Sequence, residues 1–290
     1  MLEPKDIDYA SITELDLSHS ELDVLPDLSM YINLVKLYCN CNNITELNNL
    51  PDSLIELYCW ENQITSLDNL PSGLLKLSCD DNNLTSLDNL PDSLIELSCN
   101  NNKLTSLDNL PSGLKKLEFS HNLLTSLDNL PVNLEILNCG NNSITSLDNL
   151  PPSLQILICN SNNIKTLDNL PPNLKTLYCY NNKIISLEYL PSSLLELYCC
   201  NNKITSLDNL PSNLETLSCN ANKITSLNNL PPNLKELDCY NNKLTSLDNL
   251  PSSLTKLSCM NNPFTYDFVP TLINIKNIKK YNATHYVSPP

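Results

Sequence analysis

The stretch that decides the fold is LIELYCWENQITSLDNLPSG, residues 54–73. It recurs with little change in units that begin at Leu34, at Leu54 and at every twentieth residue up to Leu254. An earlier, degenerate unit begins at Ile12 and brings the number of units to thirteen. Self-similarity at a fixed short period indicates a solenoid, in which each unit packs only against its neighbours.

The pattern inside one unit predicts a short strand that ends in a turn. Leu57 and Cys59 are two residues apart, the spacing of side chains that share one face of a strand. Tyr58 and Trp60 are therefore predicted on the opposite, exposed face. Asn62 is predicted to close the strand, because an Asn side chain can bond a turning backbone. Stacked units would align these strands in one long parallel sheet.

The segment LxxLxCxxNx(I/L) resembles the signature of leucine-rich-repeat proteins, and the 20-residue unit is similar to their shortest class. That class occurs in secreted bacterial effectors, and similar Cys-bearing repeats occur in giant DNA viruses of amoebae. The resemblance covers about residues 12–264 and departs from the class in carrying Cys for Val and Asp-Asn for the internal Pro-x. The matching residues are Leu54, Leu57, Cys59, Asn62, Ile64, Leu67, Leu70 and Pro71.

The resemblance implies a horseshoe with one long parallel sheet on its concave side, an extended or turn-like convex side and little helix. We predict a single solenoid over residues 1–290. Residues 1–33 form an N-terminal cap and the degenerate unit, 34–264 form twelve 20-residue repeats, and 265–290 form a C-terminal cap and tail. Leu272, Ile275 and Ile278 have roughly helical spacing after Pro270, which favours a short capping helix or an extended lid.

Eleven of the thirteen Cys occupy one position of the repeat, and Phe119 and Leu17 occupy it in the other two units. Apolar residues in that position predict a buried slot that Cys fills as a small hydrophobe. Disulfides and a zinc site are weaker alternatives, because parallel side chains one strand apart converge on neither geometry. Reduced thiols imply a reducing compartment.

Two polar rows accompany the Cys row. The Asn row, which includes Asn62, predicts a structural hydrogen-bond ladder. The acidic row, which includes Asp68 and Asp88, places like charges one repeat apart, so Asx-turns to the following backbone are predicted to compensate them. A row of calcium sites is the alternative, although the unit lacks the Gly-rich turn that such rows use.

Composition excludes several classes of function. The chain has 17 Lys plus Arg against 32 Asp plus Glu and a net charge of −15, which disfavours nucleic acid and anionic membranes as partners. The N-terminus does not resemble a signal peptide, and no apolar run reaches the roughly 18 residues of a transmembrane helix. With the Cys pattern, these features predict an intracellular, cytoplasmic protein, in the host cell if the chain is viral.

The sequence offers no catalytic constellation. His19, His121 and His285 are too far apart along the predicted solenoid to act together, and the three Gly are too few for a phosphate-binding loop. Some bacterial effectors of this family carry a separate ubiquitin-ligase domain, but only about 26 residues follow the repeats, and none is Cys. We therefore predict no enzyme activity, no metal and no cofactor.

Information about a partner must lie where the repeats differ on the exposed sheet face. The residue before the second Leu alternates between Glu and Lys over the first six units, from Glu14 to Lys116. This alternation predicts a ladder of ion pairs between neighbouring strands, whose charges satisfy one another. Apolar and aromatic residues then form two candidate patches for partner binding. One patch comprises Tyr38, Tyr58 and Trp60; the larger comprises Ile136, Ile156, Ile158, Tyr178, Tyr180 and Tyr198.

Aromatic residues on strands are also favoured by β-propensity and cross-strand stacking alone, so stacking without binding stays an alternative. The predicted function is a non-catalytic module that binds an unknown protein, for example a host protein if the source is a virus or pathogen. The alternative is a structural or self-assembling repeat protein, which would form oligomers.

Overall fold

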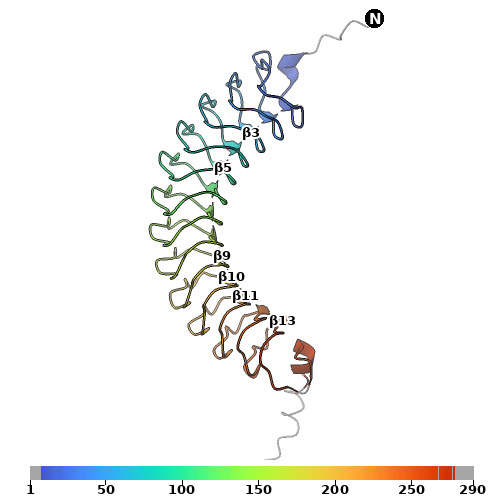
Figure 1. Cartoon of the computed structure of the whole chain (residues 1–290), viewed down its shortest axis with the longest axis vertical. Coiled ribbons are helices and arrows are strands. Elements are labelled where there is room, and N and C mark those ends of the chain that lie inside the picture. The colour runs from blue at the N-terminus through green and yellow to red at the C-terminus, as the bar shows by residue number, and fades with distance from the viewer. Residues whose placement is uncertain (1–7, 267, 276, 278–290) are drawn as a thin grey trace, which may run out of the picture. The chain divides into compact units, whose positions relative to one another are not determined.

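The computed structural model describes residues 8–266, 268–275 and 277. The chain divides into two compact units, Met1–Ile144 with Asn149–Leu154, and Thr145–Asp148 with Gln155–Pro290. Each unit is a stack of coils of one kind, with a three-residue strand on one side of each coil and turns on the other (Figure 1). The parallel solenoid with little helix that the repeat predicts is confirmed, whereas the division into a single domain with two caps stays a prediction.

The first unit begins with a short 3-10 helix, η1 (Tyr9–Ser11), and its strands follow one another in sheet order. They are β1 (Glu14–Asp16), β2 (Lys36–Tyr38), β3 (Glu56–Tyr58), β4 (Lys76–Ser78), β5 (Glu96–Ser98), β6 (Lys116–Glu118) and β7 (Ile136–Asn138).

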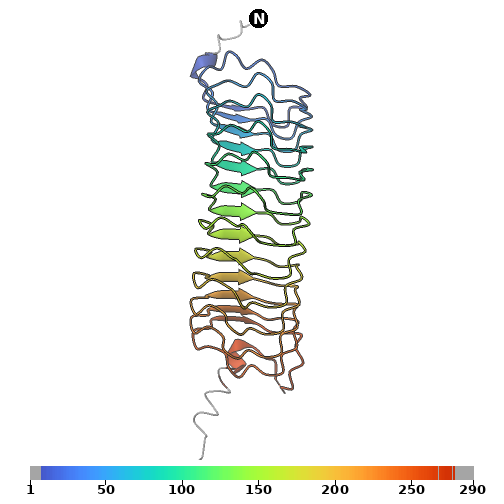
Figure 2. The ribbon, with the colours of Figure 1, turned by 90° about the vertical axis from the view of Figure 1, so that its left-hand side faces the viewer.

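The strands of the second unit also follow sequence order and are parallel (Figure 2). They are β8 (Ile156–Ile158), β9 (Thr176–Tyr178), β10 (Glu196–Tyr198), β11 (Thr216–Ser218), β12 (Glu236–Asp238) and β13 (Lys256–Ser258). In both units each strand residue pairs with the residue one repeat away, as Leu57 pairs with Leu77. Equivalent side chains therefore lie side by side on neighbouring strands.

The core is built from the repeated apolar positions. In the unit that opens at Leu54, the side chains of Leu54, Leu57, Cys59, Ile64 and Leu67 are 0–2% exposed. The Leu70 position is only half-buried, so this Leu completes the edge of the core. Burial of these side chains against the next coil is the main stabilising contribution of each repeat.

The Asn ladder is confirmed and joins successive coils. Asn62 Nδ2 donates to the carbonyl oxygens of Cys59 at 3.1 Å and of Cys39, one repeat earlier, at 3.0 Å. Its Oδ1 accepts the backbone N–H of Ile44 at 2.9 Å. One buried amide thus satisfies backbone groups of two repeats that would otherwise be unpaired.

The acidic row is compensated in a different way from the one predicted. Asp68 Oδ1 accepts Nδ2 of Asn89 at 2.7 Å, and Asp88 Oδ1 accepts Nδ2 of Asn109 at 3.0 Å. The bonds therefore run between repeats instead of within an Asx-turn. Asn89 and Asn109 themselves lie at left-handed turns, with φ of 64° and 63°, a conformation that Asn tolerates better than most residues.

The last coil is covered by aromatic residues. Phe264 occupies the final Ile/Leu position of the repeat and is half-buried, and its ring centroid lies 5.4 Å from that of Tyr266. The Tyr266 hydroxyl accepts the backbone N–H of Leu247 at 2.7 Å. Residues 272–275 and 277 are helical and Ile275 is buried, which confirms the helical alternative for this segment. Predicted features at Ile278 and beyond lie outside the described residues.

Candidate functional site

The exposed face of the sheet is the surface on which the repeats differ. Every strand from β2 to β12 buries its central Leu and leaves the residue on either side half-buried. The nine residues predicted as partner-binding are all half-buried, where the sequence predicted exposure. The difference arises because in-register neighbours cover the flanks of each side chain.

The smaller patch lies on the first unit. The rings of Tyr38 and Tyr58 stack at a centroid distance of 4.8 Å and an interplanar angle of 12°. The Tyr58 hydroxyl donates to Glu56 at 2.8 Å, and Lys36 pairs with Glu56 at 3.2 Å. Trp60 follows β3 and is half-buried, but among the described residues it joins no ring stack. This patch is therefore a stacked tyrosine pair that is hydrogen-bonded to Glu56, a member of the charge ladder.

The charge ladder is confirmed in part. Lys36 pairs with Glu56, and Lys76 pairs with Glu96 at 3.1 Å, both between neighbouring strands. The hydrogen bond from Tyr58 is the main cause of a lowered pKa of Glu56, and the nearby lysines lower this pKa further. Lys116 instead pairs within its own strand, with Glu118 at 3.1 Å.

The larger predicted patch is divided between the two units. Ile136 belongs to β7 of the first unit, and the other members belong to the second unit. Within the second unit, Ile156 and Ile158 on β8 are in register with Thr176 and Tyr178 on β9. The structure thus brings isoleucines and tyrosines together on neighbouring strands, as the sequence predicted.

The centre of this patch is a second pair of stacked tyrosines. The rings of Tyr178 and Tyr198 lie 4.4 Å apart at 4°, closer and more nearly parallel than the first pair. The Tyr198 hydroxyl donates to Glu196 at 3.3 Å. Burial, followed by the Glu196 charge, raises the pKa of Tyr198 to about 12. Tyr180, two residues beyond β9, is half-buried, and Tyr240 is 40% exposed.

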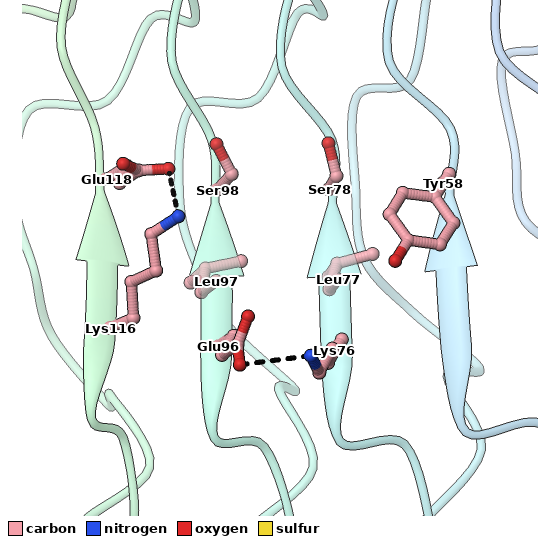
Figure 3. Close-up of a pocket in the computed structure, with 9 residues that line it drawn as sticks. All are labelled: Tyr58, Lys76, Leu77, Ser78, Glu96, Leu97, Ser98, Lys116 and Glu118. Atoms are coloured by element: carbon pink, nitrogen blue, oxygen red, sulfur yellow. Dashed lines mark ion pairs between the residues drawn. The ribbon is translucent and has the colours of Figure 1, made fainter.

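Two hollows in the sheet face were not predicted from the sequence. Each begins at the second tyrosine of a stacked pair and extends over the strands that follow. The first, of about 250 Å³, runs from Tyr58 over β4–β6 and is crossed by the Lys76–Glu96 and Lys116–Glu118 pairs (Figure 3). The second, of about 360 Å³, runs from Tyr198 over β11–β13. The signal in the sequence is a Tyr followed, one repeat later, by a Ser.

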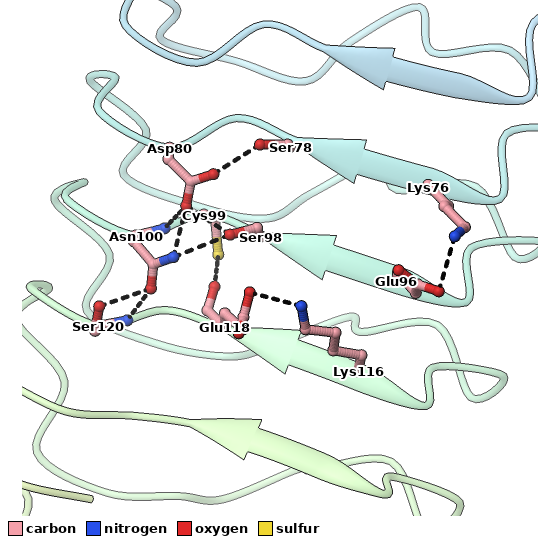
Figure 4. Close-up of polar contacts among 10 residues, drawn as sticks. All are labelled: Lys76, Ser78, Asp80, Glu96, Ser98, Cys99, Asn100, Lys116, Glu118 and Ser120. Atoms are coloured by element: carbon pink, nitrogen blue, oxygen red, sulfur yellow. Dashed lines mark hydrogen bonds and ion pairs between the residues drawn. The ribbon is translucent and has the colours of Figure 1, made fainter. Parts of the chain in front are cut away.

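A polar network lies beside the first hollow (Figure 4). Asp80 accepts Ser98 Oγ at 2.6 Å, Asn100 Nδ2 at 2.7 Å and, through its other oxygen, Ser78 Oγ at 2.7 Å. Asn100 in turn accepts Ser120 Oγ at 2.7 Å. Because each group is already bonded within the chain, this half of the sheet face offers a partner few unsatisfied polar atoms.

The cysteine row is a ladder of buried thiols. Eleven of the thirteen Cys are buried, and none forms a disulfide in the described residues. Burial raises the pKa of Cys139 to about 12 and that of Cys59 well above its usual value. Thiolates are the metal ligands and nucleophiles, so these thiols are suited to packing. No group of three His, Cys, Asp or Glu able to hold a metal ion lies in the part of the chain that the structure describes.

The turn side of the second unit carries exposed apolar residues that were not predicted as a site from the sequence. Ile185 and Tyr189 are 59% and 63% exposed and replace the Thr and Asn that most repeats have there. They line a hollow of about 200 Å³ with Lys165 and Glu188. Their departure from an otherwise regular repeat is the signal that could have identified them.

Among solved structures, the chain is similar to a leucine-rich effector protein, YopM of Yersinia pestis. The identity is 33%, the match covers 86% of this chain and 78% of YopM, and the TM-score is 0.73. The chain belongs to the leucine-rich-repeat proteins. This confirms the resemblance to repeats of bacterial effectors that the sequence suggested, and a leucine-rich-repeat domain is a module generally used for protein–protein interaction.

Two leucine-rich-repeat proteins of Listeria monocytogenes are also similar. The internalin InlF is 26% identical over 89% of this chain and 83% of its own, with a TM-score of 0.78. The functional domain of InlJ, described as including a cysteine ladder, is 31% identical over 89% of this chain and 65% of its own, with a TM-score of 0.71. No family model and no curated protein matches the sequence.

Proposed function

We propose that this leucine-rich-repeat chain is a non-catalytic module that binds a protein partner on the exposed face of its sheet. The observation that carries the proposal is the stacked Tyr178–Tyr198 pair, which lies beside Ile156 and Ile158 on β8. Tyrosines are among the residues that supply most of the binding energy in protein interfaces, and the centre of such an interface is apolar. The proposed contact residues of the second unit are Ile156, Ile158, Tyr178, Tyr180 and Tyr198.

The first unit offers a smaller contact surface. Tyr38, Tyr58 and Trp60 are proposed as secondary contacts, and Ile136 as an aliphatic contact at the end of that unit. The hydroxyl of Tyr58 is bonded to Glu56, which is itself paired with Lys36. Since those groups are already satisfied, a partner gains less there than at the second unit.

The nature and location of the partner are further parts of the proposal. Similarity to an effector protein favours a protein of a host cell as the partner, with a pathogen or virus as the source of the chain. Cysteines that form no disulfide, in both units, favour a reducing compartment such as the cytoplasm. The acidic charge disfavours nucleic acid and anionic membranes as partners. Among the described residues, no helix has the length and apolar composition needed to cross a bilayer.

The test compares capture of proteins from a lysate by the intact chain and by a double variant, Ile158→Ser with Tyr178→Ser. The matched control is Leu123→Ser with Val132→Ser, which removes two exposed apolar side chains that lie outside the strands of the first unit. We expect the first variant to lose a captured protein that the control retains, with both variants keeping the circular dichroism of the parent. Capture that is unchanged by the first variant would overturn the proposal.

Self-assembly is the second candidate, because a stacked aromatic pair can also contact its copy in another chain. Sedimentation velocity at several concentrations separates the two functions. Concentration-dependent association that the Ile158→Ser, Tyr178→Ser variant abolishes would favour self-assembly. A single species at all concentrations would favour a different protein as the partner.

A further inference from the structure

The two stacked tyrosine pairs have similar geometry but different electrostatic surroundings. Glu56, beside the first pair, lies in register between Lys36 on β2 and Lys76 on β4. Glu196, beside the second pair, lies between Thr176 on β9 and Thr216 on β11. Among the described residues, Glu196 joins no ion pair, whereas Glu56 pairs with Lys36.

The hollow next to the second pair is also short of cations. Glu236, Asp238 and Lys256 line it, so two carboxylates face one ammonium group. Lys256 is bonded to Glu236 at 2.5 Å, which leaves the charge of Asp238 without a cationic partner among the described residues. Asp238 receives only neutral donors, chiefly Asn220 Nδ2 at 2.6 Å.

The corresponding hollow in the first unit is electrically balanced. Two lysines and two glutamates line it, and each lysine is paired, Lys76 with Glu96 and Lys116 with Glu118 (Figure 3). The two hollows occupy equivalent places in the repeat, so their difference in charge comes from the side chains. Thr216 stands where the first unit has Lys76.

The second hollow also offers an aromatic wall. Tyr178 covers one face of the Tyr198 ring, and Tyr198 forms one end of the hollow. The register neighbour of Tyr198 on β11 is Ser218, which is too short to cover an aromatic ring. A tyrosine ring with carboxylates nearby attracts cations, and a planar guanidinium can both stack on the ring and bond the carboxylates.

We propose that the hollow between Tyr198 and Lys256 binds the guanidinium group of an arginine that the partner protein presents. This inference rests on the proposed function and adds the chemistry of the partner: an arginine seated between Tyr198 and Asp238, next to apolar contacts on β8 and β9. The first hollow does not bind such a group, because its own lysines already satisfy the carboxylates.

The test uses small probes, so that it does not depend on finding the partner. N-acetyl-arginine amide is titrated into the protein with ¹³C-labelled tyrosine rings, and the ring resonances are followed by NMR. Tyr198→Phe and Tyr58→Phe assign the two signals. N-acetyl-citrulline amide, the uncharged analogue, and N-acetyl-lysine amide are the comparison probes. We expect a saturable shift of the Tyr198 signal with the arginine probe, roughly threefold to tenfold weaker binding of the lysine probe, and no shift with citrulline.

A reciprocal exchange supplies the matched variants. Thr216→Lys places a lysine where the first hollow has Lys76, and should weaken arginine binding at Tyr198 by tenfold or more. Lys76→Thr leaves the first hollow with two carboxylates and one ammonium, the same set of charges as the second, and should create an arginine response at Tyr58. Both residues are natural at this position of the repeat, so neither exchange should unfold the chain.

Three results would overturn the inference: citrulline or lysine probes that bind as tightly as arginine, or a Tyr198 response that Thr216→Lys leaves unchanged. The failure of the proposed function looks different. Arginine binding with no loss of protein capture in Ile158→Ser, Tyr178→Ser would disprove the proposed interface and leave the guanidinium site intact. Loss of capture without arginine binding would keep the interface and disprove the guanidinium site.

Discussion

The side-chain amide of Asn82 donates to the carbonyl oxygen of Cys59, in the preceding repeat, at 3.1 Å. The same Nδ2 also donates to Cys79 at 3.2 Å, and Oδ1 accepts the backbone N–H of Ile64 at 2.9 Å. These contacts recur along the Asn row, so each coil is fastened to the one before it by a buried amide. Hydrophobic stacking alone would leave these backbone groups unpaired.

Asn82→Ala should therefore lower the free energy of unfolding by about 2–4 kcal/mol, because it strands a buried N–H and buried carbonyls. Asn133→Ala, at an exposed position, is the matched control and should change stability by less than about 0.5 kcal/mol. Urea unfolding followed by circular dichroism measures both. Equal effects of the two substitutions would show that the ladder does not hold the coils together.

Most of the fold could be predicted from the sequence because the period of 20 residues fixes the register. Once Leu57 is aligned with Leu77, the Cys and Asn rows must also align, and their burial follows from their residue types. The partner of Asp68 could not be predicted in this way. That partner is the side chain of Asn89, which lies at a left-handed turn one repeat later and donates to Asp68 at 2.7 Å.

The sequence predicted which residues make up the candidate site, but not the shape of the surface that they form. The composition of the two patches was visible, and stacking of Tyr178 on Tyr198 follows from equal register. Their half-burial and the hollow beside Tyr198 depend on how far each side chain extends over its neighbour. The charge around the hollow also depends on which residues stand in register on neighbouring strands. Glu196, for example, has a threonine and not a lysine on either side.

Thiol accessibility separates the buried ladder from two other cysteines. Cys41 and Cys200 are half-buried and lie outside the ladder, whereas the ladder thiols are buried. A colorimetric thiol reagent such as DTNB should therefore react at pH 8 with two thiols quickly and with the remaining eleven only on unfolding. The variant Cys41→Ser with Cys200→Ser should abolish the fast phase. A fast phase that persists in this variant would place ladder thiols at the surface.

Stability should fall at alkaline pH. Burial raises the pKa of Cys139 from 9.0 to about 12, so the folded state keeps a proton that the unfolded chain releases above pH 9. The contribution of this protonated thiol to the free energy of unfolding is complete below pH 9 and is lost as the pH rises towards 12. Each such thiol lowers the free energy of unfolding by about 1.4 kcal/mol per pH unit in this range. Thermal midpoints should be level from pH 7 to 8 and decline above 9.

The matched control for the alkaline effect is Cys99→Val with Cys139→Val, which leaves the tyrosines in place. The decline of its thermal midpoint above pH 9 should be shallower than that of the parent chain, whatever its stability at neutral pH. Parallel declines in the two proteins would assign the alkaline effect to groups other than the ladder thiols.

Phe119 tests how tightly the cysteine slot is packed. Its side chain is fully buried where most repeats carry Cys. Phe119→Cys restores the usual residue but should destabilise the chain by about 2–4 kcal/mol, because the surrounding coils are packed around the larger ring and a cavity remains. Phe119→Leu, which retains more volume, should cost less. If Phe119→Cys were neutral, the coils would have to close freely around the smaller residue.

Ala221 offers a test in the stabilising direction. It has a left-handed φ of 52° and donates its N–H to Tyr240 O at 2.9 Å, at a position where neighbouring repeats carry Asn201 and Asn241. A left-handed conformation strains Ala, whereas Gly and Asn adopt it readily. Ala221→Gly and Ala221→Asn should each raise the free energy of unfolding by about 0.5–1 kcal/mol. The reciprocal variant, Asn241→Ala, should lower it by a similar amount, and thermal unfolding by circular dichroism compares all three. A loss of stability in both Ala221 variants would mean that the methyl group contributes packing that outweighs the backbone strain.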